Sequence, residues 1–421
     1  MGMPHPARFA LLPALTAADF TALDELAQSE LRRLNVPGTA IAVVHEGKVV
    51  HARGYGVRSV ETQEPVTDDM LFRVGSTTKM ATAAGLVMLA EAGRLKLDEP
   101  IGNLVKDLHP AIARLTSHQL LSHTAGLSDP SVMTGPRDES ALKSRILEMD
   151  ERAFFEEPGR VYSYSNPGYW IAGLVQEEVS GHAYTEHLRR RIFEPLGMER
   201  SAFSPLVAMT WPFAIGHDGE GRAPPRIVRP LAENAAAYPA GQLFTTAPEF
   251  ARFCIAFMQG GVWQDRQVIP AAVIEKMSAP HAAMPTEDRH YGYGLSVRER
   301  EGLRWLSHSG SRTGYGSFVA MCPQRQFAVI ILCNKTGANL MRVADKAAEL
   351  VLGVAINEPA KKENLAMSAE EMARYAGTYA SGSARAVLSV RDGKLMGAQG
   401  SEIRKTGDNR FLRAAAGRLP E

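Results

Sequence analysis

Segments with strand character lie near both ends of the 421-residue chain, and a long helical stretch separates them. Near the start, residues 39–44 and 48–52 flank a Glu46-Gly47 turn, which predicts a β-hairpin. Strand character returns at residues 303–308, 317–321 and 327–332. This distribution predicts one antiparallel sheet built from both ends of the chain, with helices packed on it and a helical insertion at about residues 95–240. We therefore expect an α+β fold.

The helix expected to start at Ser76 and to stop at Gly93 is apolar on nearly all sides. A helix without a polar face is normally enclosed by protein, so the pattern predicts a buried central helix. The strand-like run 71–75 precedes it. Further helices are predicted at about residues 16–34, 247–258, 270–277 and 339–352.

The main domain is expected to span residues 1–356, and the polar stretch 357–364 is typical of a linker. Short β elements follow, in a predicted small β appendage at residues 365–421. About 50 residues are too few for a closed, self-sufficient barrel, which leaves an incomplete lipocalin-like piece as one interpretation. An oligomerisation element or a substrate gate is the other.

Composition argues against several function classes. The chain is 45% hydrophobic and 22% charged with a formal net charge of +1, so it offers no electrostatic case for binding nucleic acid or an anionic membrane. It has no run of about 18 apolar residues and no basic segment before the short apolar stretch at 9–12, so we expect neither a membrane span nor a leader peptide. A cytoplasmic protein is the default expectation, and a periplasmic one is the alternative if a leader precedes this chain.

Cysteine and histidine patterns point away from metals. The three cysteines, Cys254, Cys322 and Cys333, form neither a disulfide framework nor a zinc pattern, and we expect buried thiols. The twelve histidines form no H-x-x-x-H or comparable cluster. The sequence therefore predicts no metal and no other cofactor.

Ser76-Thr77-Thr78-Lys79 lies at the boundary between the strand-like run and the central helix. Positions i and i+3 of a helix share a face, so the Ser76 hydroxyl and the Lys79 amine can meet there. A serine hydroxyl is a weak nucleophile at neutral pH and needs such a base. The first turn of a helix also supplies positive potential and free backbone N–H groups. Ser76 is therefore the candidate nucleophile and Lys79 a candidate base.

Two more polar motifs follow. Tyr164-Ser165-Asn166 lies in the helical middle, and His308-Ser309-Gly310 ends a predicted strand. Burial can lower the pKa of Lys79, and a lysine and a helix end could stabilise a Tyr164 phenolate. The residues leave open which of the two is the acylation base, and either could return the proton to the leaving group. The Asn166 amide can hold Lys79 and the carbonyl on the acyl side of a substrate.

In this order, Ser-x-x-Lys, Tyr-x-Asn and His-Ser-Gly resemble the motifs of the serine penicillin-recognising hydrolases: class C β-lactamases, D-Ala-D-Ala carboxypeptidases, D-aminopeptidases and family VIII carboxylesterases. The resemblance covers about residues 23–353, including segments 120–127, 239–246 and 291–295. It implies a sheet of about five strands beside a helical domain, and a short C-terminal β extension. It also implies cofactor-free hydrolysis through an acyl-enzyme, with the oxyanion held by the backbone N–H groups of Ser76 and Ser311.

The third motif departs from the pattern of many of these relatives, which begin it with lysine. Here it begins with His308, and a neutral imidazole attracts a substrate carboxylate less strongly than an ammonium group does. Arg312, four residues on, could restore the charge. We therefore expect a carboxylesterase on short-chain esters, with weak or promiscuous β-lactamase activity. Gly310 is expected to let the substrate lie close against its strand.

Three alternatives stay open. One is a peptidase or amidase on D-amino-acid substrates, the second is a true β-lactamase, and the third is an inactive penicillin-binding-type sensor or binding protein. For the enzymes the partner is a small-molecule ester or amide, and the sequence leaves room for a homo-oligomer. The α/β-hydrolase class lacks support, because no Gly-x-Ser-x-Gly nucleophile elbow occurs.

Other residues have a structural interpretation beside a functional one. Lys335-Thr336-Gly337 and Lys405-Thr406-Gly407 both spell a third motif, but each is interpreted as a turn. His123 is expected to be structural rather than catalytic. Trp305 and Tyr315 flank the third motif and could line the acyl pocket or pack in the core.

Overall fold

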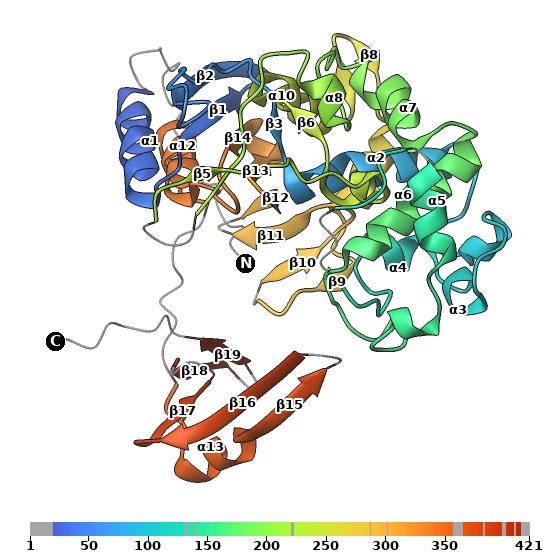
Figure 1. Ribbon diagram of the computed structural model, residues 1–421, viewed down its shortest axis with the longest axis vertical. Coiled ribbons are helices and arrows are strands. Elements are labelled where there is room, and N and C mark those ends of the chain that lie inside the picture. Colours follow the sequence, from blue (N-terminus) through green and yellow to red (C-terminus); the bar gives the residue numbers. More distant parts are fainter. Residues whose placement is uncertain are drawn as a thin grey trace, which may run out of the picture. The chain divides into compact units, whose positions relative to one another are not determined.

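The computed structural model describes residues 20–130, 134–138, 140–219, 223–286, 288–300, 302–356, 365–381, 384–397, 401–407 and 410–413 (Figure 1). The chain forms two compact units that divide after Ile356. The larger unit carries all three motifs. The expected start of the first helix at residues 16–19 and the expected linker at 357–364 lie outside the described residues.

The larger unit is built on one antiparallel sheet of eight strands, in the order β2-β1-β14-β13-β12-β11-β10-β9 (Figure 1). The strands span Gly38–His45 (β1), Lys48–Gly56 (β2), Ala282–Ala283 (β9), Arg289–Tyr291 (β10), Ser296–Arg300 (β11), Leu303–Arg312 (β12), Tyr315–Cys322 (β13) and Phe327–Cys333 (β14). The N-terminal hairpin joins the last strand through β1 and β14, where Ile41 lies opposite Ile331. The predicted α+β fold is thus confirmed, with strands from both ends of the chain in one sheet.

The sheet is larger than the five strands that the resemblance implied. β9 and β10 have two and three residues, too few to show a period-2 pattern in the sequence. β11 is mostly polar, and its pairing with β12 rather than its composition makes it a strand. These strands extend the edge beyond β12, and β10 ends at Tyr291, a neighbour of His308.

Helices and short strand pairs make up the rest of the larger unit. The helices span Thr21–Leu34 (α1), Thr78–Glu91 (α2), Pro110–Ala113 (α3), Ser117–Leu121 (α4), Ser140–Leu147 (α5), Asn166–Ser180 (α6), Tyr184–Leu188 (α7), Pro205–Ala208 (α8), Tyr238–Gly241 (α9), Ala247–Met258 (α10), Ala271–Ser278 (α11) and Met341–Leu352 (α12). The short strands pair Phe72–Arg73 (β3) with Phe244–Thr245 (β6), His217–Asp218 (β4) with Arg226–Ile227 (β5), and Val262–Trp263 (β7) with Arg266–Gln267 (β8). No helix in the described part of the chain is long and apolar enough to cross a membrane.

Helices cover both faces of the sheet, and neighbouring residues of a strand point to opposite faces. Ile41 and Ile331 pack in one core with α1 and α12. Ala42 and Ile330 belong to the second, larger core, which includes α2 and α10. A strand buried on both faces is a continuous apolar run, which is why β14 is so plain in the sequence.

The central helix α2 is buried as predicted, with every residue from Thr78 to Leu89 inside the protein. The α-helix begins at Thr78, two residues later than expected, because Ser76 lies in a preceding 3-10 turn that spans Gly75–Thr77. The turn is tied to β13: the Thr77 hydroxyl lies 2.8 Å from the hydroxyl of Ser317. Ser76 is therefore held between the central helix and the sheet.

The smaller unit, in its described part, consists of a helix and short antiparallel strands. They span Ala369–Tyr375 (α13), Gly377–Ser381 (β15), Ala384–Arg391 (β16), Lys394–Met396 (β17), Ile403–Gly407 (β18) and Arg410–Arg413 (β19). β15 to β17 form one sheet, and β18 pairs with β19. The expected turn at Lys405-Thr406-Gly407 is wrong, because this segment is part of β18 and Lys405 lies opposite Phe411 of β19.

β12 approaches the Ser76 turn so closely that two positions require glycine. A Cβ at Gly310 would lie 1.9 Å from the Val74 carbonyl oxygen, and one at Gly75 would lie 2.7 Å from the Ser311 amide nitrogen. Gly75 also has a φ of +54°, which favours glycine. We expected Gly310 to make room for a substrate, but the backbone of the chain itself takes that space.

Replacing Gly310 by alanine should lower the free energy of unfolding by about 1–3 kcal/mol, because the new methyl group forces β12 away from Val74. Denaturant unfolding of Gly310→Ala measures this change. The matched control is Ser309→Ala, on the same strand but with an exposed side chain. It should change the free energy by less than about 0.5 kcal/mol. Equal effects of the two substitutions would contradict the close approach.

Candidate active site

The Lys79 amine lies at the centre of a small hydrogen-bonded group. Its Nζ is 3.3 Å from Ser76 Oγ. The same amine donates to Asn166 Oδ1 and to the Ala240 carbonyl oxygen, each at 2.7 Å. The side chain is completely buried. Two hydrogen-bonding positions of Nζ thus face carbonyl oxygens, and a third faces the serine hydroxyl.

Burial lowers the pKa of Lys79 well below its ordinary value, because the ammonium form is removed from water. The Asp129 carboxylate opposes this shift, and the Arg312 guanidinium adds to it. A neutral amine has two N–H donors and one lone pair, which matches two carbonyl neighbours and one hydroxyl neighbour. In that form Lys79 can accept the Ser76 proton.

The Tyr164 ring lies beside the same amine, with Lys79 Nζ 4.8 Å from the ring centroid. Its hydroxyl oxygen is buried and has no hydrogen-bond partner among the described residues. Burial raises the pKa of the Tyr164 phenol, and the neighbouring Ser76 hydroxyl offsets only part of that rise. Tyr164 is therefore suited to donate a proton rather than to accept one.

Asn166 opens α6 and is held in one orientation. Ser165 caps the helix, since its hydroxyl accepts from the Gly168 amide at 3.4 Å. Asn166 Nδ2 donates to both carboxylate oxygens of Asp129 at 3.1 Å, and the Asn166 backbone N–H donates to Asp129 Oδ1 at 3.1 Å. These bonds leave the amide oxygen directed at Lys79.

His308 lies on β12 and is buried. Its Nδ1 is 2.6 Å from the Ser309 carbonyl oxygen, and its Nε2 is 2.9 Å from the Tyr291 hydroxyl. A carbonyl oxygen only accepts, so Nδ1 carries the proton and Nε2 accepts from Tyr291. Burial lowers the pKa of His308 to about 3. The imidazole is therefore uncharged at neutral pH.

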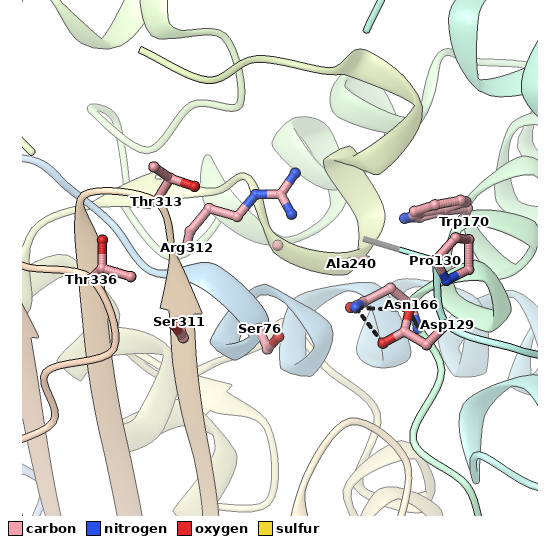
Figure 2. Close-up of a pocket in the computed structure, with 11 residues that line it drawn as sticks. Ser76, Asp129, Pro130, Asn166, Trp170, Ala240, Ser311, Arg312, Thr313 and Thr336 are labelled. Carbon is pink, nitrogen blue, oxygen red and sulfur yellow. Dashed lines mark hydrogen bonds between the residues drawn. The ribbon is translucent and has the colours of Figure 1, made fainter. Parts of the chain in front are cut away.

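Two cavities open beside Ser76. The acyl-side cavity, named for its Asn166 wall, has a volume of about 280 Å³ and is lined by Ser76, Asp129, Pro130, Asn166, Trp170, Ala240, Gly241, Ser311, Arg312, Thr313 and Thr336 (Figure 2). The His308-side cavity has a volume of about 250 Å³ and is lined by Ser76, Tyr164, His308, Ser309, Gly310, Ser311, Gly337 and Asn339. Every candidate site residue lines one of them except Lys79, which is buried beside Ser76.

The two cavities differ in charge. Figure 2 shows Arg312 reaching from β12 across the space above Ser76, toward the side where Trp170 and Asp129 lie. Among the described residues, the lining of the His308-side cavity contains no lysine, arginine, aspartate or glutamate. Arg312 lines the acyl-side cavity and is not among the described residues that line the His308-side cavity.

Five lining residues belong to no motif and were missed: Asp129, Pro130, Trp170, Thr313 and Asn339. Thr336 and Gly337 also line the cavities, although their segment was interpreted as a turn. Trp170 could have been found, because it lies four residues after Asn166 and so shares its face of α6. Asp129 lies in a loop and gives no pattern in the sequence. Only tertiary packing brings it to Asn166.

Three residues with two interpretations prove to be structural. Lys335 donates to the Leu34 carbonyl oxygen at 2.9 Å, so the Lys335–Gly337 turn does not supply the third motif, although Thr336 and Gly337 line the cavities. Trp305 and Tyr315 are buried in the two cores and line neither cavity. In the described ranges, no group of three or more His, Cys, Asp or Glu side chains could hold a metal ion.

A serine hydroxyl within reach of a buried amine, beside a tyrosine and an asparagine, defines the site of a serine hydrolase. The Beta-lactamase family model matches residues 23–354, and the chain belongs to this family of serine hydrolases. The resemblance drawn from the three motifs is confirmed.

Three similar proteins place the chain within the family. Penicillin-binding protein 4 of Amycolatopsis lactamdurans is 28% identical over 311 residues, which cover 71% of this chain and 81% of that protein. The octameric penicillin-binding protein homologue from Pyrococcus abyssi is 26% identical with a TM-score of 0.70, covering 94% of this chain and 90% of that one. The D-amino acid amidase from Ochrobactrum anthropi SV3, complexed with L-phenylalanine, is 25% identical with a TM-score of 0.66, covering 80% and 98%.

The neutral His308 should make folding stability depend on pH. Its folded pKa of about 3 lies below the ordinary value of 6.5, so the unfolded chain binds the proton first. The stabilisation is complete above about pH 6.5 and is lost as the pH falls toward 3. Between pH 7 and pH 5 this one group should account for about 2 kcal/mol of the free energy of unfolding.

Denaturant unfolding of the wild type and of His308→Asn at both pH values tests this expectation. On acidification the free energy of unfolding of the variant should fall by about 2 kcal/mol less than that of the wild type, whatever its stability at neutral pH. An identical pH dependence in both proteins would show that His308 is not held neutral by burial.

Proposed function

We propose that this protein is a carboxylesterase that hydrolyses short-chain esters through an acyl-enzyme, with only weak β-lactamase activity. In the proposed reaction Ser76 Oγ attacks the substrate carbonyl as its proton passes to Lys79. The backbone N–H groups of Ser76 and Ser311 hold the oxyanion. Tyr164 donates a proton to the leaving alkoxide and recovers one from the Lys79 ammonium, and water then hydrolyses the acyl-enzyme.

The directions of the pKa shifts support this division of roles. Burial favours the neutral form of Lys79, which has a lone pair for the Ser76 proton. Burial favours the neutral form of Tyr164 as well, which has a proton to give. Of the two candidate bases, Lys79 is therefore the one we assign to acylation, and Tyr164 is the acid that serves the leaving group.

The single observation that carries the preference for esters over β-lactams and carboxypeptidase substrates is the absence of charged side chains among the described residues that line the His308-side cavity. Because Tyr164 lines this cavity, we assign it to the leaving group. A β-lactam or a carboxypeptidase substrate brings a carboxylate to this side, and an uncharged His308 attracts it weakly. An alcohol needs no such partner. The Arg312 backbone lies roughly 13 Å farther along β12, and its side chain lines the acyl-side cavity instead.

The acyl-side cavity limits the acyl group. Its volume of about 280 Å³ also includes the space next to the nucleophile. Small-molecule sites range from about 300 to 1,000 Å³, so this cavity lies near the lower end of the range and accommodates a short acyl chain. Asn166 lies on its wall with its Nδ2 group bound to Asp129, and its amide oxygen, which accepts from Lys79, has a second lone pair for a substrate N–H.

Hydrolysis of p-nitrophenyl acetate and butyrate should be faster than hydrolysis of nitrocefin and of D-alanine p-nitroanilide. We expect kcat/KM for the esters to exceed that for nitrocefin by at least about 100-fold, since uncompensated loss of a charge-assisted contact costs roughly 3 kcal/mol. Ser76→Ala should abolish all turnover and serves as the control for contaminating esterases.

Dominant nitrocefin turnover would contradict the ester preference and favour a true β-lactamase. The inactive-sensor alternative would gain if no substrate were turned over and a fluorophosphonate probe left no adduct on Ser76.

A second candidate function is an amidase or peptidase for D-amino-acid substrates. It is favoured by the Asp129 carboxylate, which lines the acyl-side cavity and could pair with a substrate ammonium group. The similarity to a D-amino acid amidase adds to this case. The uncharged His308-side cavity fits it equally well, because an amide releases ammonia or a neutral amine.

Asp129→Asn distinguishes the two candidates. The new side chain keeps an oxygen that can accept from Asn166 but loses its charge. If an amino-acid substrate binds there, kcat/KM for D-alanine p-nitroanilide should fall about tenfold or more relative to that for p-nitrophenyl acetate. An unchanged ratio of the two values would exclude Asp129 as an ammonium partner.

A further inference from the structure

His123 follows α4 in a loop that reaches the site, but the proposed reaction gives it no part. The side chain is fully buried, and burial holds the pKa of the ring well below its ordinary value. Its backbone has a φ of +59°, a left-handed conformation that is uncommon among non-glycine residues, although histidine adopts it more often than most. Strain of this kind collects at functional sites, which makes the contacts of His123 informative.

Two hydrogen bonds connect His123 to the chain on either side of Tyr164. The Ser163 N–H donates to the His123 carbonyl oxygen at 2.8 Å. The Ser165 N–H donates to His123 Nδ1 at 3.1 Å. Backbone and side chain of one histidine therefore hold the residues before and after Tyr164.

The imidazole also contacts the Tyr164 ring directly. The two ring centroids are 4.2 Å apart with the planes tilted by 35°. Tyr291, which binds His308, lies against the same imidazole at 4.6 Å. Because Nδ1 accepts, the ring proton is on Nε2, and that atom is buried without a hydrogen-bond partner in the part of the chain that the structure describes. The imidazole thus supplies one acceptor, Nδ1, and one ring face, and both act on the Tyr164 segment.

We propose that His123 is a positioning residue for Tyr164, which holds the phenol where it can protonate the leaving group. The proposal rests on the function proposed above, in which Tyr164 is the proton donor. The strained backbone of His123 has a reason in this arrangement: it lets the carbonyl oxygen and Nδ1 of one residue reach two amides that flank the same tyrosine.

A misplaced proton donor affects only those substrates whose leaving group needs a proton. p-Nitrophenolate is stable enough to leave as an anion, whereas ethoxide is strongly basic and must be protonated as it leaves. Ethyl butyrate and p-nitrophenyl butyrate share an acyl group, so the ratio of their kcat/KM values isolates the step that Tyr164 serves. A general loss of folded protein lowers both values by the same factor and leaves this ratio unchanged.

Two substitutions separate the contributions of His123. His123→Phe keeps a ring against Tyr164 but removes the acceptor for the Ser165 N–H. His123→Asn keeps an oxygen near the position of Nδ1 and tolerates the left-handed backbone, but removes the ring. Tyr164→Phe serves as the reference for complete loss of the proton donor. His187→Phe is the matched control, because His187 is a buried histidine on α7 outside both cavities.

The experiment measures kcat/KM for both butyrate esters in the wild type and in each variant. We expect His123→Phe to lower the value for ethyl butyrate at least about tenfold more than that for p-nitrophenyl butyrate, in the direction of Tyr164→Phe, since general acid catalysis contributes roughly 10²–10⁴-fold. His123→Asn should stay closer to the wild-type ratio, and His187→Phe should keep it. In the double variant His123→Phe/Tyr164→Phe, the ratio of the two kcat/KM values should change no more than in Tyr164→Phe alone.

Equal losses for the two esters in His123→Phe, while Tyr164→Phe discriminates between them, would overturn the role of His123 and leave the proposed function intact. If Tyr164→Phe also failed to discriminate, the assignment of Tyr164 as proton donor would fall, and the role of His123 with it. If His123→Phe did not fold, a wild-type ratio in His123→Asn together with an altered ratio in His123→Ala would support the acceptor role. Wild-type ratios in both would overturn it.

Discussion

The site depends on the burial of one amine. Lys79 lies in the first turn of a helix that is enclosed on all sides, so its amine cannot reach water and must find partners inside the protein. Those partners are the amide oxygen of Asn166 on α6 and the carbonyl oxygen of Ala240 on α9. α2, α6 and α9 must therefore pack together for the lysine to be tolerated. The contacts that satisfy its N–H groups also leave the amine facing Ser76.

A second constraint comes from the sheet. β12 lies so close to the Ser76 turn that Gly310 meets the Val74 carbonyl oxygen and Gly75 meets the backbone of Ser311. This contact couples the nucleophile to the strand that lines both cavities. His308 and Arg312, four residues apart on this strand, line different cavities: one without charged side chains among its described residues, and one that also contains Asp129. An uncharged imidazole and a guanidinium thus lie in separate cavities beside Ser76.

Much of this arrangement could be predicted from the sequence, because it depends on local patterns. β1, β13 and β14 are continuous apolar runs, and α2 is apolar all round, so their burial was plain. β9, β10 and β11 were missed because they are too short or too polar to show a period. The same limit explains the outcome at residues 405–407, where pairing with β19 makes a strand of a segment that resembles a turn.

Spacing and residue type alone were enough to find the three motifs and their order. In the first motif, a hydroxyl and an amine at positions i and i+3 of a helix start share a face in any protein. The tertiary structure decided the burial of the motif residues and therefore their charge states. The pKa directions of Lys79, Tyr164 and His308 follow from how completely neighbouring elements exclude water, which no local pattern records. Asp129 belongs to the site for a similar reason, because tertiary packing brings its loop against the start of α6. The sequence thus specified which groups are present, and packing of distant segments specified their charge and their neighbours.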